Sequence, residues 1–186
     1  MGLALLVFYG LRRVAVRQVM ETGAIFDASR QYRYALWRRW DKTIPKVVFI
    51  MLNPSTADAT TNDPTICRCM RFAQAWGYGG LEVVNLFALM ATDPQQLKAA
   101  IDPIGQACDQ YLLDAVKRAD RVVIAWGNWG SLQQRDQAVL ALLAPEMPLY
   151  CLGMNRSGQP RHPLYLPQTT TPLRFDRKKA KNTNSP

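Results

Sequence analysis

The sequence of 186 residues contains a single histidine, His162, and few cysteines. Metal centres that need several histidines are therefore excluded, and any histidine chemistry depends on this one side chain. The four cysteines have neither the spacing of a disulfide framework nor that of a zinc knuckle: Cys67, Cys69, Cys108 and Cys151. We therefore expect free thiols in a reducing cytoplasm, and neither a metal nor an organic cofactor.

Long hydrophobic runs are also missing. The apolar run of residues 3–11 is too short to cross a bilayer, and no basic residue precedes it as in a secretory signal. We expect no membrane contact. Residues 1–19 form an N-terminal extension of undecided status, because Met20 is an alternative start to Met1. Residues 20–175 are expected to form one domain, and residues 176–186 a basic, disordered tail.

Acidic residues are scarce relative to basic ones. The chain has 14 Asp and Glu against 23 Lys and Arg, a net charge of +9 and a pI of about 9.7. Such a charge favours a polyanionic partner, which we expect to be a nucleic acid or a nucleotide. The alternative is that the charge serves solubility alone.

Four short apolar runs predict a sheet at the centre of the domain. They span residues 47–52, 81–86, 121–126 and 149–152, and their continuous hydrophobicity is typical of buried parallel strands. Caps and helical periodicity predict helices over residues 63–76, from residue 93, over 105–117 and over about 132–143. This alternation predicts an α/β fold, a three-layer α/β/α sandwich around a mainly parallel four-stranded sheet.

Residues 26–40 combine arginines with aromatic side chains. Such a combination is typical of a surface on which the bases of a nucleic-acid strand stack. The alternative, which we favour, is an amphipathic helix with Tyr34, Leu36, Trp37 and Trp40 turned inward.

Polar residues follow the predicted strands at the edge where α/β sheets collect their functional groups. Asn53 follows the first strand and Asn85 ends the second, Trp126 and Gly127 follow the third, and His162 lies beyond the fourth. A buried asparagine needs hydrogen-bond partners or a ligand. Two asparagines in equivalent positions favour a ligand.

The phrases at residues 52–58, 63–65 and 158–165 resemble DUF1643, a bacterial and phage family of unknown function. More broadly, Asn53-Pro54, residues 84–87, residues 122–127 and His162-Pro163 resemble, in order and spacing, the motifs of uracil-DNA glycosylases. The likeness is to the mismatch-specific branch, in which asparagine replaces aspartate. It spans residues 46–167 and implies a uracil-DNA-glycosylase-like fold.

The resemblance also implies roles. Asn53 would position water against an anomeric carbon, Asn85 would read a pyrimidine edge, and His162 would donate to the departing base. The base must first leave its stack. Ser55 stands where the uracil-specific branch has an aromatic residue, which implies tolerance of bulkier bases. With Asn53 and His162 as catalytic candidates, the substrate-binding candidates are Pro54, Ser55, Asp58, Asp63, Arg68, Arg71, Asn85, Trp126, Gly127, Arg161, Pro163, Leu164 and Tyr165.

Structural roles compete with these functional ones. His162 can tie a loop, Asn53 can belong to a simple turn, and Asp63, a candidate base or metal ligand, is better placed to cap a helix. Arg68 and Arg71 share a helix face that binds phosphate or is simply solvated.

We expect a protein of the uracil-DNA-glycosylase-like type that handles a base of a nucleic acid or nucleotide, and the reaction that this resemblance implies is hydrolysis of the N-glycosidic bond of a modified or mismatched base. The alternatives are a noncatalytic nucleic-acid-binding module and an enzyme that acts on free nucleotides or nucleosides.

Overall fold

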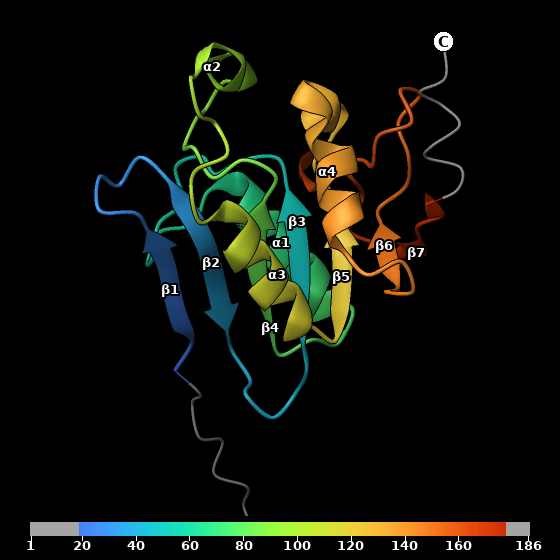
Figure 1. The fold of residues 1–186 in the computed structure, drawn as a ribbon. Helices are drawn as coiled ribbons and strands as arrows, with labels where there is room; N and C mark the ends of the chain where they lie inside the picture. The colour runs from blue at the N-terminus through green and yellow to red at the C-terminus, as the bar shows by residue number, and fades with distance from the viewer. Residues whose placement is uncertain (1–18, 178–186) are drawn as a thin grey trace, which may run out of the picture.

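The computed structural model describes residues 19–177, which form one mixed β-sheet with helices on both faces (Figure 1). The sheet has the strand order β1-β2-β4-β3-β5-β6-β7. Its strands are β1 (Glu21–Phe26), β2 (Arg33–Arg39), β3 (Lys46–Met51), β4 (Gly80–Asn85), β5 (Arg121–Ile124), β6 (Leu149–Cys151) and β7 (Leu173–Arg174).

The four strands predicted from apolar runs are β3, β4, β5 and β6, and they pair in parallel. The prediction of a four-stranded sheet is nevertheless wrong, because β1, β2 and β7 add antiparallel strands at the two sides. A continuous apolar run detects only a strand that is buried on both faces. The flanking strands carry polar and half-exposed residues, so that signal misses them.

Helix α1 (Pro64–Ala75) covers one face of the sheet, whereas α3 (Cys108–Lys117) and α4 (Arg135–Leu142) cover the other (Figure 1). The short α2 (Pro94–Ala99) adds Leu97 to the core beneath α3 and α4. Neighbouring residues of β3 enter opposite cores, since Phe49 packs with α1 and Ile50 with the α3 side.

The predicted helix boundaries hold best where a cap marks them. Asp63 caps α1 and Pro64 begins it, and Asp93 and Pro94 do the same for α2. The third and fourth helices start three residues later than predicted. Before α4 lies the 3-10 segment η1 (Asn128–Gln134), in which Gln133 and Gln134 have φ of 52° and 54°. These left-handed residues stop the helix from extending backward.

The arginine-rich segment predicted as an amphipathic helix is the strand β2. Ala35 and Leu36 are adjacent yet belong to opposite cores, which is the period of a strand. Aromatic side chains favour strands as well. Over so short a stretch, the sequence pattern does not distinguish the period of a helix from that of a strand.

Arg38 of β2 is fully buried and ties the loop after β3 to the sheet. Its guanidinium donates to the carbonyls of Gly23, Trp37, Asp58 and Thr61 and to the side chain of Asn62. Each donor therefore has an acceptor, and the bonds to Asp58, Thr61 and Asn62 anchor the loop of residues 53–62 to β2.

The chain remains packed up to its last described residues. Phe175 is buried, and the guanidinium of Arg177 donates to the carbonyls of Leu140, Leu143, Ala144 and Met147. Arg177, which lies within the predicted disordered tail, thus caps the C-terminus of α4. Residues 1–18 and 178–186, most of the predicted extension and tail, lie outside the described range. Within residues 19–177, no helix has the length and apolarity needed to span a membrane.

Arg38→Met should lower the free energy of unfolding by about 3 kcal/mol or more, because several buried carbonyls lose their charged donor. Arg156→Met is the control: Arg156 is exposed, and its replacement should change stability by less than about 0.5 kcal/mol. Urea titration of both variants measures the difference. Equal midpoints for the two variants would show that Arg38 does not anchor the loop.

Candidate functional site at the carboxyl ends of the strands

A cavity of about 510 Å³ lies at the carboxyl ends of β3, β4 and β5, beside the first turn of α1. Its volume falls within the range of small-molecule sites. Parallel strands joined by crossovers bring their carboxyl ends to one edge, so turns distant in sequence meet there. The predicted site residues that line it are Asn53, Ser55, Asp63, Asn85, Trp126, Gly127, His162 and Leu164.

Asn85 has the least satisfied side chain of the cavity. It is 3% exposed, and neither its amide nitrogen nor its amide oxygen has a hydrogen-bond partner among residues 19–177. Such a group costs about 1–3 kcal/mol for each buried atom left unpaired. Because the side chain belongs to the lining, a ligand in the cavity can supply both missing bonds. One donor and one acceptor side by side match the amide-like edge of a nucleobase.

Asn53 is held with its amide oxygen available. Its Nδ2 donates to the carbonyl of Pro54 at 2.8 Å and to that of Ala91 at 2.7 Å. Two carbonyl acceptors require the nitrogen on that side, which fixes the orientation of the amide. Oδ1 therefore remains as an acceptor that can hold a water molecule or a substrate group.

His162 is oriented by its own backbone. Its Nδ1 accepts a hydrogen bond from the Leu164 N–H at 3.3 Å, so the neutral ring carries its hydrogen on Nε2. Burial lowers the pKa of His162 below its ordinary value, although nearby Asp63 opposes this shift. The side chain is thus a neutral donor, and the loop-tying role and a role in the cavity coexist.

Asp63 caps α1, as the sequence favoured. Its Oδ1 accepts from the Ile66 N–H at 2.8 Å, and the residue is 9% exposed. The same carboxylate lines the cavity. Among residues 19–177, no group of three or more His, Cys, Asp or Glu side chains gathers that could hold a metal ion.

The cavity wall that follows β5 is held by a buried chain of polar side chains. Trp126 Nε1 donates to Gln159 Oε1 at 2.7 Å, and Gln159 Nε2 donates to Asp136 Oδ2 at 2.7 Å. Gly127, with φ of 75°, lets the strand end turn toward His162 without a side chain in the way. Trp126, which is 2% exposed, is therefore fixed among buried residues at the cavity.

Arg33 is a lining residue that the sequence did not single out. It is 2% exposed, its Nη1 donates to the Ala57 carbonyl, and its Nε has no partner. Burial lowers its pKa to about 10, so it remains charged at neutral pH. A buried arginine among strand residues has no distinctive sequence pattern, which is why sequence reasoning missed it.

Several predicted site residues lie outside the cavity lining, namely Pro54, Asp58, Arg68, Arg71, Arg161, Pro163 and Tyr165. Asp58 closes a local turn by accepting from the Thr60 and Thr61 N–H groups, which lower its pKa to about 2. Arg68 and the backbone of Arg71 contact Gln168.

Arg161 is exposed and donates to the Met154 carbonyl. Tyr165 is 90% exposed and stands next to Leu164, which does line the cavity. These two residues are the sequence neighbours of lining residues and form an exposed rim beside the cavity, not part of its wall.

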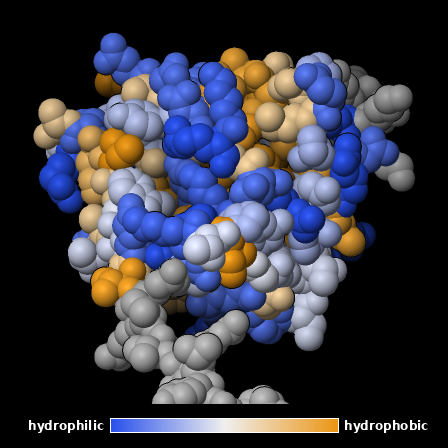
Figure 2. Space-filling view, turned by 90° about the horizontal axis from the view of Figure 1, so that it is seen from below, coloured by the Kyte–Doolittle hydropathy of each residue, from blue (hydrophilic) through white to orange (hydrophobic). Residues whose placement is uncertain are grey.

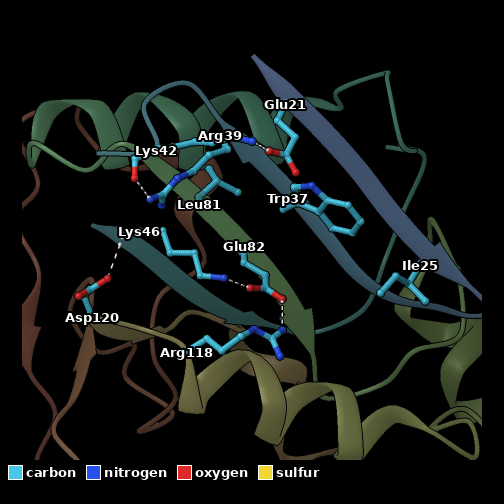
Figure 3. A pocket seen from close by; sticks show the side chains of 10 residues that line it. All are labelled: Glu21, Ile25, Trp37, Arg39, Lys42, Lys46, Leu81, Glu82, Arg118 and Asp120. Carbon is cyan, nitrogen blue, oxygen red and sulfur yellow. Dashed lines mark hydrogen bonds and ion pairs between the residues drawn. The ribbon is translucent and has the colours of Figure 1, made fainter. Parts of the chain in front are cut away.

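A second hollow, of about 610 Å³, lies at the opposite edge, where the parallel strands begin (Figure 3). Viewed from that side, hydrophilic residues gather over the middle of the molecule (Figure 2). Glu82 pairs with Lys46 at 2.5 Å and Arg118 at 3.1 Å, and Glu21 pairs with Lys42 at 2.6 Å. Glu82 and Glu21 are thus in ion pairs, and Asp120 accepts from the Lys46 N–H, whereas the first cavity leaves Asn85 unpaired.

The four cysteines are free, as predicted. Burial raises the pKa of Cys69 and brings that of Cys108 to about 11. Neither thiol is therefore a nucleophile at neutral pH.

Asn85→Leu should raise the free energy of unfolding by about 1–3 kcal/mol, because an apolar group of similar shape removes two unpaired polar atoms. Asn128→Leu should instead lower it by about 1 kcal/mol, since Asn128 Oδ1 accepts from Asn155 and Ser157. Urea midpoints of the two variants provide the comparison. Destabilisation by Asn85→Leu would mean that Asn85 is already satisfied.

The neutral state of His162 should make stability fall in acid. A lowered pKa in the folded state means that its contribution is complete above the unfolded pKa of about 6.5 and is lost as pH falls through the folded pKa. The stability difference between wild type and His162→Gln, measured from about pH 8 to about pH 4, should therefore shrink in acid. A difference that grows on acidification would contradict this assignment.

The family model described as "Protein of unknown function (DUF1643)" matches residues 33–164, which include Arg33, Asn53, Asn85 and His162. No curated protein and no solved structure matches the chain significantly. The match covers well over half of the sequence, and the chain belongs to the DUF1643 family.

Proposed function

We propose that this protein binds a nucleobase of a nucleic acid or nucleotide in the cavity at the carboxyl ends of the strands and hydrolyses its N-glycosidic bond. The observation that carries the proposal is the buried amide of Asn85, which has one donor and one acceptor side unpaired within the cavity. A base edge offers the complementary acceptor and donor. The resemblance of the strand-end motifs to uracil-DNA glycosylases supports the same role.

The positions of Asn53 and His162 suit the two halves of the reaction. Asn53 Oδ1 accepts a hydrogen bond from the attacking water, while Nδ2 stays anchored to the backbone. The neutral His162 donates from Nε2 to a base oxygen, where negative charge develops as the bond breaks. Water oxygen bonds to the anomeric carbon, the carbon–nitrogen bond breaks, and the base leaves with the electron pair and takes up a proton.

The walls of the cavity suit a flat ring. Trp126 is fixed by the Gln159 bond, and Trp129 of η1 also lines the space. Base–aromatic stacking contributes about 1–3 kcal/mol in known sites. On the rim, the exposed Tyr165 is placed to contact the neighbouring part of a strand from which the base has been extruded.

His162→Gln and Asn53→Ala should each lower turnover by about 100-fold or more while leaving substrate affinity nearly unchanged, because both act mainly in the transition state. Their effects should be far from additive in the double variant. Arg156→Met, on an exposed loop, is the control that should retain activity. The measurement is the release of free base from a panel of oligonucleotides that contain uracil, hypoxanthine, mismatched or hypermodified bases.

The same panel decides against catalysis in one clear case. If wild-type protein releases no base, and both variants lose nucleic-acid affinity in step with folding stability, the protein is a noncatalytic binding module. Activity confined to free nucleosides or nucleotides would instead identify an enzyme of small-molecule metabolism.

A further inference from the structure

Arg33 brings more hydrogen-bond donors to the cavity than the protein uses. One donor bond, from Nη1 to the Ala57 carbonyl, accounts for its hydrogen bonds, and its buried Nε has no partner. Within residues 19–177 it forms no ion pair. Burial lowers its pKa, and the nearby Asp63 and Asp58 oppose this shift. A buried charge is ordinarily paired, because an unpaired charge loses its hydration without compensation.

Arg38, on the same strand, shows what a purely structural arginine looks like here. It is equally buried, contacts the same loop of residues 53–62, and satisfies its guanidinium with four carbonyls and Asn62. The loop is thus anchored by Arg38. The unused donors of Arg33 do not serve that purpose.

A β-bulge directs Arg33 toward the cavity. In the pairing of β1 with β2, Ile25 is opposite Ala35 and Phe26 is opposite Arg33, so Tyr34 has no partner. Tyr34 and Ala35 both face the α3 side, where Tyr34 stacks on Tyr111. Arg33 consequently returns to the α1 side, and strict alternation would have placed it among the apolar residues beneath α3.

We propose that Arg33 binds an anionic group of the cavity ligand, so that the base bound by Asn85 belongs to an acidic molecule. The acid is a phosphate of the same nucleotide or a carboxylate on the base, since a planar guanidinium binds either one. The claim that the anion belongs to a base rests on the proposed function. The claim that Arg33 binds an anion does not. A cavity of about 510 Å³ has room for a base together with its acidic group.

Asp63 is the charge that competes with such an anion. Its carboxylate caps α1, so the positive end of the helix dipole already offsets part of its charge. Asp63→Asn keeps an oxygen for the cap and removes the negative charge. The variant should therefore bind an acidic ligand several-fold more tightly than wild type. If Asp63 were instead the counter-ion that Arg33 requires, its replacement would lower the stability of the protein.

The test is calorimetric binding by wild type, Arg33→Met and Arg38→Met. The probes are common nucleosides, their 5′-monophosphates, carboxylated uracil, inorganic phosphate and a short single-stranded oligonucleotide. Wild type should bind an acidic probe more tightly than its neutral counterpart, and Arg33→Met should lose about tenfold to a hundredfold of that preference. Arg38→Met should lose stability but keep the preference. Which acidic probe responds identifies the source of the anion.

The outcomes separate the two proposals. An equal preference in wild type and Arg33→Met, or no preference in wild type for any acidic probe including phosphate, overturns the role of Arg33. If Asn85→Leu leaves the affinity for acidic probes unchanged while Arg33→Met removes it, base recognition fails and the anion site stands. Loss of neutral-base binding in Asn85→Leu alone supports the division of roles between the two residues.

Discussion

Two-sided burial of β3 constrains the rest of the molecule. Four of its six residues, Val47, Val48, Phe49 and Ile50, are fully buried, because β4 and β5 pair with the strand and helices pack on both faces. The strand runs parallel to β4 and β5, and β5 runs parallel to β6, through crossover connections, which brings the carboxyl ends of these four strands to one edge. The chain leaves β3 directly into Asn53, so polar groups meet at that edge.

At this edge, the loop of residues 53–62 is held by contacts that lie outside the cavity. Arg38 anchors residues 53–62 through carbonyls, and the buried chain from Trp126 to Asp136 holds the opposite wall. Polar groups used in this way are satisfied. The buried side-chain atoms without partners in the described residues belong to Arg33, Arg39, Arg68 and Asn85, and two of these four residues line the same cavity.

The sequence predicted the centre of this fold and the meeting of Asn53, Asn85 and His162, because both follow from apolar runs and strand-end positions. It did not predict β1, β2 and β7, since half-exposed strands have mixed polarity. It also missed Arg33, whose direction depends on a bulge at Tyr34 that no local pattern announces. Arg68 and Arg71 do not line the cavity, because helical spacing fixes their shared face but not what that face contacts.

The contrast between the two hollows shows where binding energy is left unused. At the amino ends of the strands, Arg39 has one unpaired nitrogen, but Glu82 is bonded to Lys46 and Arg118, so a ligand that binds Glu82 would have to replace existing ion pairs. At the carboxyl ends, Asn85 and Arg33 lost their water on folding and gained little in return. A ligand that supplies their partners recovers bonds whose desolvation cost was already met during folding, which is the physical basis of a preorganised site. The stability that the apo protein forgoes at these two side chains is therefore available for specificity, with the amide selecting a base edge and the guanidinium selecting charge.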